Sequence, residues 1–254
     1  MSLFIISCEI DTPHEFEEND NNETGEINDT NDDDKISREV FTIGSYHITD
    51  FTNTRAERMR NTIDDIITEF DVLYVDGIGS DVINSFNSIL EDLNMNYITM
   101  VDDDIRRLIV FNERVVELES FDVIESGLHN DFFEAVFIMS DEEIVVSGLR
   151  MDRYNAMSEI RRMDEVIAEY DDNVLFMGTM YSDCLYYNTR WSRDFEWLIP
   201  HNIDTTSEGR GCSFDKIISQ EEHRFHIEDY GVIEKRDLDR LSEHLPVFVR
   251  IMVN

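Results

Sequence analysis

The sequence predicts an α/β (α+β) fold, a four-layer sandwich in which two facing mixed β-sheets are flanked by helices. The first observation is that, from about residue 40 onward, amphipathic helical segments alternate with short apolar segments of strand length. The second is that pairs of strands are joined by long amphipathic crossovers, which is typical of sheets covered by helices. The length of 254 residues allows one large domain or two small ones, and we expect a single domain over residues 1–254 with a substantial core.

An acidic segment near the N-terminus interrupts the alternation. Residues 11–37 are polar and poor in aromatic side chains, which predicts a mobile insertion. Residues 15–35 hold ten acidic residues and one lysine, which accounts for only part of the net charge of -36. The rest of the chain is therefore acidic as well.

The first half of the remaining chain predicts two helices and several strands. Residues 55–70 carry apolar side chains at helical spacing, and the apolar run at 72–75 follows as a strand. Ser80 is the expected N-cap of a second helix, which ends near residue 93. Short strands are expected at residues 96–100, 107–112 and 115–118.

The second half predicts a hairpin, a helix and three further strands. Residues 132–139 and 143–151 flank a short polar turn and form the hairpin. Helical spacing returns over residues 154–170 and leads into a buried strand at 174–177, which stops at Gly178. The last strands are expected at residues 213–219 and 245–253.

The charge of the chain restricts its partners. An acidic surface repels phosphate backbones, whereas lysine and arginine contacts supply most nucleic-acid affinity. We therefore do not expect direct binding of duplex DNA, and a basic protein or a macromolecular assembly is the expected partner. The composition, rich in Asn, Asp and Ile, suggests an AT-rich genome, so a viral or phage origin is a further hypothesis.

The cysteines and the apolar segments indicate the compartment. Cys8, Cys184 and Cys212 have no metal-ligand spacing and leave an odd number for disulfides, which is typical of a reducing compartment. The apolar run at residues 3–6 is too short for a signal peptide or a membrane anchor. A cytoplasmic protein that does not contact membranes is expected.

Six short polar signatures follow the apolar strands in order. They are SYHI (45–48), YVDG (74–77), VSGLRMD (146–152), MGTMYSD (177–183), SFDKII (213–218) and SEHLPV (242–247). Their order and spacing over residues 40–254 resemble the endonuclease/exonuclease/phosphatase superfamily, whose fold is that of deoxyribonuclease I. SEHLPV is similar to the closing Ser-Asp-His-Xaa-Pro-Val of that family, and SFDKII to its Ile-Asp-Tyr-Ile strand.

The resemblance implies a magnesium-dependent phosphodiesterase or phosphatase site. The family's metal-binding glutamate corresponds to Asp76, and its closing Asp-His pair to Glu243 and His244, so that Asp76 and Glu243 are the candidate Mg²⁺ ligands. Asp215 is retained. The asparagine of the first strand corresponds to His47, or to Cys8 if residues 4–10 are that strand. We also expect the strand ending at Asp76 to lie beside the strand ending at Gly178.

Three other positions depart from the family pattern. The mid-chain histidine corresponds to Leu149, which neither binds phosphate nor moves a proton. The aspartate and asparagine that orient the attacking water correspond to Thr179 and Tyr181. Asp152 and Asp183 are the candidates to replace the lost ligands, although nearby carboxylates are also expected by chance in so acidic a chain.

Two functions follow from this reading. The first is a catalytically inactive nuclease- or phosphatase-fold protein that acts as an acidic binding or structural module and needs no cofactor. The second is a divergent Mg²⁺-dependent phosphodiesterase, phosphatase or nuclease that uses Asp76, Asp215, Glu243 and His244. The site distinguishes them, because an active enzyme needs a convergent set of carboxylates around a metal ion.

Overall fold

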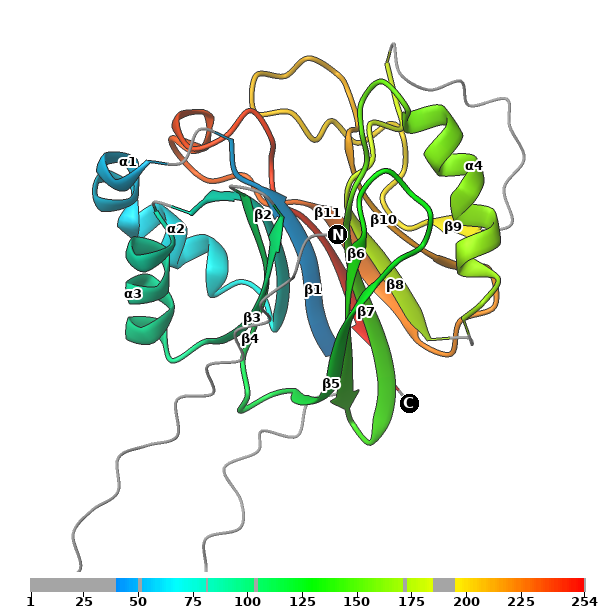
Figure 1. Ribbon diagram of the computed structural model, residues 1–254. Coiled ribbons are helices and arrows are strands. Elements are labelled where there is room, and N and C mark those ends of the chain that lie inside the picture. The colour runs from blue at the N-terminus through cyan, green and yellow to red at the C-terminus, as the bar shows by residue number, and fades with distance from the viewer. Residues whose placement is uncertain are drawn as a thin grey trace, which may run out of the picture.

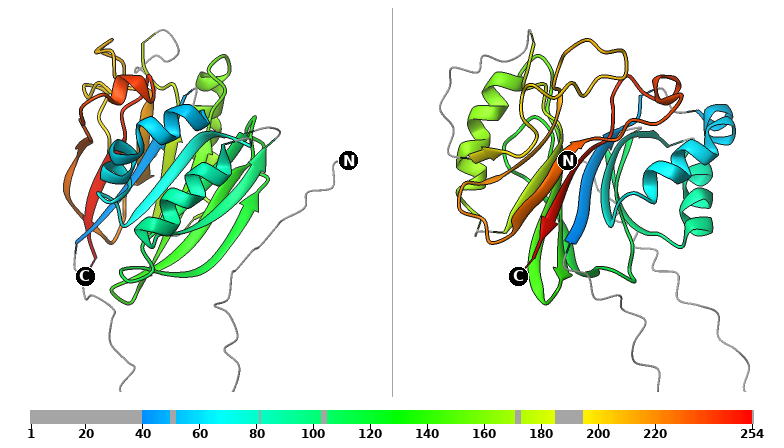
Figure 2. Two further views of the ribbon diagram at one scale, coloured as in Figure 1. Left: turned by 90° about the vertical axis from the view of Figure 1, so that its left-hand side faces the viewer. Right: turned by 180° about the vertical axis from the view of Figure 1, so that it is seen from behind.

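The structure is a computed structural model that describes residues 40–49, 52–80, 82–102, 105–170, 173–184 and 195–253. The expected insertion at residues 11–37 and the rival first strand with Cys8 lie outside this part of the chain. The described residues form the four layers that the sequence predicts, with two six-stranded mixed sheets packed face to face (Figure 1). The right view in Figure 2 shows the helices on the two outer faces.

The first sheet has the strand order β11-β12-β1-β2-β4-β3. Strands β1 and β2 are parallel, and all the other neighbours in this sheet are antiparallel. Three helices cover its outer face, seen at the left of Figure 1. The strands are β1 (Val40–His47), β2 (Val72–Gly79), β3 (Asn96–Asp102), β4 (Ile105–Phe111), β11 (His226–Val232) and β12 (Val247–Met252), and the helices are α1 (Asn53–Arg58), α2 (Arg60–Ile67) and α3 (Ile83–Leu93).

The second sheet has the order β5-β6-β7-β8-β10-β9. Its parallel pair is β7 and β8, and helix α4 (Ala156–Ile167) connects them across the outer face. This helix carries the only long crossover of the sheet among the described residues. The strands are β5 (Glu117–Ile124), β6 (Phe132–Met139), β7 (Glu142–Arg150), β8 (Val174–Thr179), β9 (Phe195–Trp197) and β10 (Asp215–Gln220), and a short 3₁₀ turn, η1 (Leu238–Arg240), precedes β12.

Three hydrophobic clusters hold the layers together. The largest lies between the sheets and includes Ile43, Ile109, Val146 and Ile217, each of which is fully buried. The other two lie between each sheet and its helices. Because successive strand residues face opposite sides, even-numbered residues of β7 enter the central cluster and odd-numbered ones face helix α4. This alternation positions the site described below.

One expected neighbourhood is wrong. The strand that contains Asp76, β2, belongs to the first sheet, whereas β8 belongs to the second. The two strands face each other across the sandwich, where the ring of Tyr74 packs over Gly148 and Gly178. Both strands end beside one site. Two strands can end together either as neighbours in one sheet or as facing strands of two packed sheets, and sequence spacing does not distinguish these arrangements.

Two local expectations also need correction. The segment expected as one helix over residues 55–70 is divided at Met59 into α1 and α2, and α3 begins at Ile83 without a side-chain cap, not at Ser80. The polar turn of the predicted hairpin is confirmed, because Ser140 and Asp141 adopt the left-handed conformation between β6 and β7.

The cysteine expectation is wrong for two of the three residues. Cys184 and Cys212 form a disulfide, which joins the segment after β8 to the segment before β10. Disulfides persist in oxidising compartments, so the cysteines no longer support a reducing one. Among the helices of the described residues, none is long and apolar enough to cross a membrane.

Candidate functional site

Polar side chains replace the central hydrophobic cluster at one end of the sandwich. Along the strands that end here, every second residue faces the central cluster. The next inward-facing residue beyond the apolar ones is polar. The register brings these ends together, since His47 is the partner of Asp76 in one sheet and Thr179 is the partner of both Arg150 and Asp215 in the other.

A bulge in β2 directs Asp76 into this site. The register of β2 against β4 shifts between Val75 and Ile78, and Gly77 in the bulge has φ +91°. A Cβ atom on Gly77 would lie 2.3 Å from the carbonyl oxygen of Ile48, so only glycine fits here. Bulges of this kind commonly change the direction of a neighbouring side chain.

The first buried pair joins His47 and Asp76. The Nδ1 atom of His47 lies 3.1 Å from Oδ2 of Asp76, and the Nε atom of Arg150 lies 3.7 Å from the same oxygen. Burial by itself raises the pKa of the Asp76 carboxyl, but the charge and hydrogen bond of His47, aided by Arg150, lower it overall. Asp76 is therefore ionised, although its Oδ1 atom is buried without a hydrogen-bond partner among the described residues.

The second buried pair joins His244 and Asp215. The Nδ1 atom of His244 lies 2.7 Å from Oδ2 of Asp215, and the Thr179 hydroxyl donates to the other carboxylate oxygen at 2.7 Å. Burial favours the neutral imidazole, but the charge and hydrogen bond of Asp215 outweigh it and raise the pKa of His244. The ring of His244 therefore holds its proton more tightly than a free imidazole does.

The two pairs are in direct contact. The rings of His47 and His244 pack edge to face, with centroids 4.7 Å apart and an interplanar angle of 79°. Ser242 connects their backbones, because its hydroxyl donates to the carbonyl of His47 at 2.6 Å and accepts from the amide of His244 at 3.0 Å. The serine of the SEHLPV signature thus fixes the closing histidine against the first strand.

Glu243 does not join these pairs. Its side chain is 60% exposed, and its carboxylate lies 3.5 Å from the guanidinium of Arg210. The amide of Glu243 donates to the hydroxyl of Thr49, which fixes the backbone but not the carboxylate. Of the predicted site residues, the structure therefore groups His47, Asp76, Asp215 and His244, and it places the Glu243 carboxylate at the surface.

The turn after β8 shows why a glycine ends this strand. Gly178 has φ +142°, and a Cβ atom there would lie 1.9 Å from the carbonyl oxygen of Leu149 on β7. Tyr181, three residues later, adopts a left-handed conformation and packs its ring against Phe214. Burial raises the pKa of the Tyr181 hydroxyl, and Asp215 adds to the effect, so the phenol stays neutral.

Leu149 does not occupy the position expected for it. Its side chain is buried in the outer cluster with Ile160 and Met163 of helix α4. The next residue, Arg150, points to the opposite side of β7 and approaches Asp76. Arg150 was missed because the mid-chain histidine of the family was assigned to Leu149, one residue too early. A one-residue change of register exchanges the two faces of a strand. The alternation of Val146, Gly148 and Arg150 on one face was the available signal.

The residues present do not fit the magnesium ion that the family resemblance implies. Mg²⁺ prefers a nearly octahedral set of oxygen ligands, usually carboxylates and water. Here Oδ2 of Asp76 is engaged by an imidazole and a guanidinium, and both oxygens of Asp215 accept hydrogen bonds. No group of three or more His, Cys, Asp or Glu side chains in the described part of the chain converges to hold a metal ion.

The two candidate replacement ligands have other partners. Asp152 accepts a hydrogen bond from the amide of Tyr154 and caps the loop before α4. Asp183 accepts from the amides of Cys184 and Ser213 and stabilises the segment around the disulfide. Both carboxylates therefore have structural partners in the loops that border the site.

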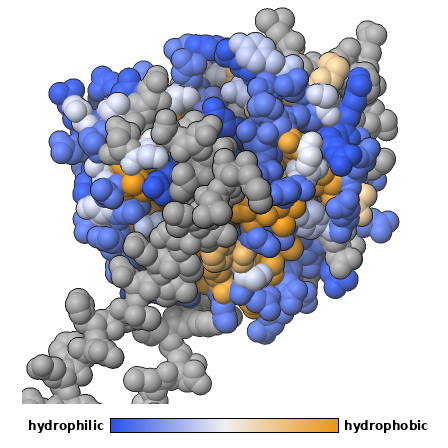
Figure 3. Space-filling model, in the orientation of Figure 1, coloured by the Kyte–Doolittle hydropathy of each residue, from blue (hydrophilic) through white to orange (hydrophobic). Residues whose placement is uncertain are grey.

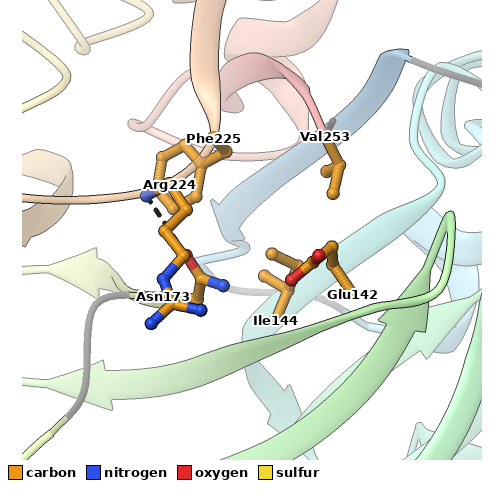
Figure 4. Close-up of a pocket in the computed structure, with 6 residues that line it drawn as sticks. All are labelled: Glu142, Ile144, Asn173, Arg224, Phe225 and Val253. Carbon is orange, nitrogen blue, oxygen red and sulfur yellow. Dashed lines mark hydrogen bonds between the residues drawn. The ribbon is translucent and has the colours of Figure 1, made fainter.

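The cavity shown in Figure 4 lies at the other end of the sandwich. It has a volume of about 190 Å³ and lies where β7 begins and β12 ends, whereas the site lies where β1 and β7 end. The amide of Arg224 donates to the side chain of Asn173 across it. Its lining residues are Glu142, Ile144, Asn173, Arg224, Phe225 and Val253, none of which belongs to the site.

No family model matches the chain, and the sequence relatives that match part of it are deoxyribonucleases. Deoxyribonuclease-1 of Gallus gallus is 26% identical over 134 residues, which cover 43% of this chain and 48% of that protein. Deoxyribonuclease-1-like 2 of Mus musculus is 28% identical over 134 residues, with coverage of 42% and 48%. The chain thus spans about half the length of these curated relatives. Deoxyribonuclease-1 of Ovis aries is 23% identical over 213 residues, with coverage of 69% and 82%.

Solved structures share the fold over most of the chain. A humanized TDP2 of D. rerio has a TM-score of 0.65 at 12% identity and covers 84% of this chain and 99% of its own. An endonuclease/exonuclease/phosphatase family protein of Bacteroides thetaiotaomicron has a TM-score of 0.64 at 13% identity, with coverage of 85% and 98%. The sandwich topology and these structures show that the chain has the deoxyribonuclease-I-like fold, and the sequence relatives support its placement in the endonuclease/exonuclease/phosphatase superfamily.

Proposed function

We propose that this nuclease- and phosphatase-fold protein does not catalyse magnesium-dependent phosphoester hydrolysis and acts as an acidic binding or structural module. One observation carries the proposal: each buried carboxylate of the site is paired with an imidazole instead of being open to a metal ion. Metal-dependent hydrolysis needs an ion that polarises the phosphate and activates water, and these pairs leave no convergent oxygen ligands for it.

The loss of the water-orienting residues supports the same conclusion. Thr179 donates its hydroxyl proton to Asp215, so this side chain does not act as a base toward water. Tyr181 is a neutral phenol packed against Phe214. Neither residue supplies the carboxylate or amide that general base catalysis of water attack requires.

The surface charge supports a basic partner. The chain carries 57 acidic and 21 basic residues, and hydrophilic residues predominate among those coloured in Figure 3, beside an exposed hydrophobic patch. A negative field attracts cationic proteins and repels nucleic-acid phosphates. The partner is therefore a basic protein or an assembly that contains one.

Hydrolysis assays test the inactive site. The wild-type protein and Asp215→Ala are incubated with a chromogenic phosphodiester, a phosphomonoester and DNA in the presence of Mg²⁺ or Mn²⁺. We expect background rates for both proteins, and calorimetric titration with Mg²⁺ is expected to give weak binding. Metal-dependent turnover that disappears in Asp215→Ala would refute the proposal.

A second assay tests the partner. Fluorescence anisotropy compares binding of a lysine-rich peptide with binding of a duplex DNA of similar charge magnitude. We expect the peptide to bind with an affinity that falls as salt rises, and the DNA not to bind. Binding of the duplex, or failure to bind the peptide at low salt, would contradict the proposed role.

One observation favours the alternative enzyme. The Oδ1 atom of Asp76 is buried and lacks a partner among the described residues, which leaves one carboxylate oxygen for a cation. The alternative is a Mg²⁺-dependent phosphodiesterase, phosphatase or nuclease that uses Asp76, Asp215, Glu243 and His244. Glu243 must then turn from Arg210 toward the site, and the hydrolysis assay distinguishes the two functions.

A further inference from the structure

The two histidines of the site share one unusual arrangement. Each ring uses its Nδ1 atom to contact a buried carboxylate, Asp76 for His47 and Asp215 for His244. Neither ring has a hydrogen bond through its Nε2 atom among the described residues. The two Nε2 atoms are therefore the unused nitrogen donors of a rigid, carboxylate-oriented pair.

This arrangement is the one found around histidine ligands of metal ions. A metal-binding histidine commonly donates its other ring N–H to a carboxylate, which fixes the tautomer and makes the free nitrogen a better ligand. Two imidazoles that bind one tetrahedral ion through Nε2 place their ring centroids roughly 5 Å apart, given metal–nitrogen bonds of about 2.0–2.1 Å. The rings of His47 and His244 are 4.7 Å apart and strongly inclined at 79°.

The donor type determines which ion fits. Mg²⁺ prefers oxygen ligands, whereas imidazole nitrogen suits zinc, copper and nickel. We propose that His47 and His244 bind one divalent d-block cation, such as Zn²⁺ or Cu²⁺, through their Nε2 atoms. Water or a bound ligand completes the coordination, because these two residues supply only two of the four or more positions.

The surroundings favour cation binding at this place. The net charge of -36 attracts cations toward the protein. Asp76 and Asp215 act as positioning residues that orient the rings and need not contact the ion. The proposal does not depend on the absence of phosphoester hydrolysis, because its readout is metal binding alone.

Calorimetric titration with Zn²⁺ in an excess of Mg²⁺ tests the site. We expect wild-type protein to bind Zn²⁺ despite the Mg²⁺, and both His47→Asn and His244→Asn to bind roughly tenfold more weakly or worse. His226→Asn is the matched control, because this side chain is 66% exposed and contacts Glu228 on the surface. Equal Zn²⁺ affinity in all four proteins would overturn the proposal.

A measurement on the unmodified protein guards against variants that fail to fold. Electron paramagnetic resonance of the wild-type protein with one equivalent of Cu²⁺ reports the nitrogen atoms bound to the ion. We expect coupling to two imidazole nitrogens, with copper bound more tightly than nickel or zinc. A spectrum with oxygen ligands only, or with a single nitrogen, would show that the two histidines do not chelate the ion.

Discussion

Replacing His244 by alanine tests how strongly the buried pairs stabilise the site. Asp215 is 1% exposed and its Oδ2 atom lies 2.7 Å from the ring of His244, so His244→Ala leaves a buried carboxylate without its nearest cation. Removing one partner of a buried ion pair typically costs about 3–5 kcal/mol. The Thr179 hydroxyl still donates to Asp215 in the variant, which places the expected loss near the lower value, about 3 kcal/mol.

Equilibrium unfolding in urea measures this loss, since urea does not screen charges as guanidinium chloride does. The double variant Asp215→Asn/His244→Ala should be less destabilised than the two single changes together suggest, because the charge that needed a partner is gone. His226→Ala is the control and should change stability by no more than about 0.5 kcal/mol, since that histidine is exposed. A loss below about 1 kcal/mol for His244→Ala would refute the claim that the imidazole compensates a buried charge.

Three further predictions follow from the structure. Gly178→Ala should lower the unfolding free energy by about 2–4 kcal/mol in urea titrations, because its Cβ would meet a backbone carbonyl at 1.9 Å and its φ disfavours side chains; an unchanged midpoint would contradict this. The Cys184–Cys212 disulfide joins residues 28 apart in the sequence, so its reduction should lower the unfolding free energy by about 3–4 kcal/mol. Thermal unfolding with and without reductant measures this loss, and no change would mean that the bond is not formed. The pKa of His244 is raised in the folded state, so protonation of this ring stabilises the fold fully below the unfolded-state pKa of about 6.5, and this stabilisation is lost as pH rises through the folded-state pKa. The difference in unfolding free energy between wild type and His244→Gln should therefore narrow from pH 5 to pH 9. A difference that widens over this range would contradict the sign of the shift.

The sequence was sufficient to predict the layers and to single out four polar residues that the structure brings together. Apolar runs of strand length locate most of the strands, and the polar residues that end them include His47, Asp76, Asp215 and His244. These residues meet because strands of both sheets end at the same side of one core. Strand β1 pairs with β2 and brings His47 next to Asp76, whereas the rival first strand with Cys8 lies outside the described residues.

Other features depend on tertiary structure that local patterns do not encode. Strand β11 lies at the edge of a sheet and is mostly exposed, so it has no apolar run to reveal it. Arg150, and not Leu149, faces the site. The two residues are adjacent on one strand and face opposite sides, and the spacing between motifs does not fix the register to a single residue. The disulfide joins Cys184 to Cys212 only because β8 and β10 are neighbours, which an odd number of cysteines does not predict.

We propose that the site keeps the scaffold of the superfamily's fold but has lost magnesium-dependent chemistry. The variant Arg150→His/Thr179→Asp/Tyr181→Asn introduces the family's histidine, aspartate and asparagine at three positions that border the site. The histidine is placed at position 150 because Leu149 is buried against helix α4. Each single change is expected to stay inactive, because groups that act as one catalytic unit are strongly non-additive.

The most direct measurement is the Mg²⁺-dependent rate of phosphodiester hydrolysis for the wild type, the triple variant and Asp215→Ala, compared in one assay. We predict background rates for the wild type and Asp215→Ala, and measurable metal-dependent cleavage for the triple variant. Metal-dependent cleavage by the wild type that is lost in Asp215→Ala would contradict the account and establish the paired carboxylates as parts of a working enzyme.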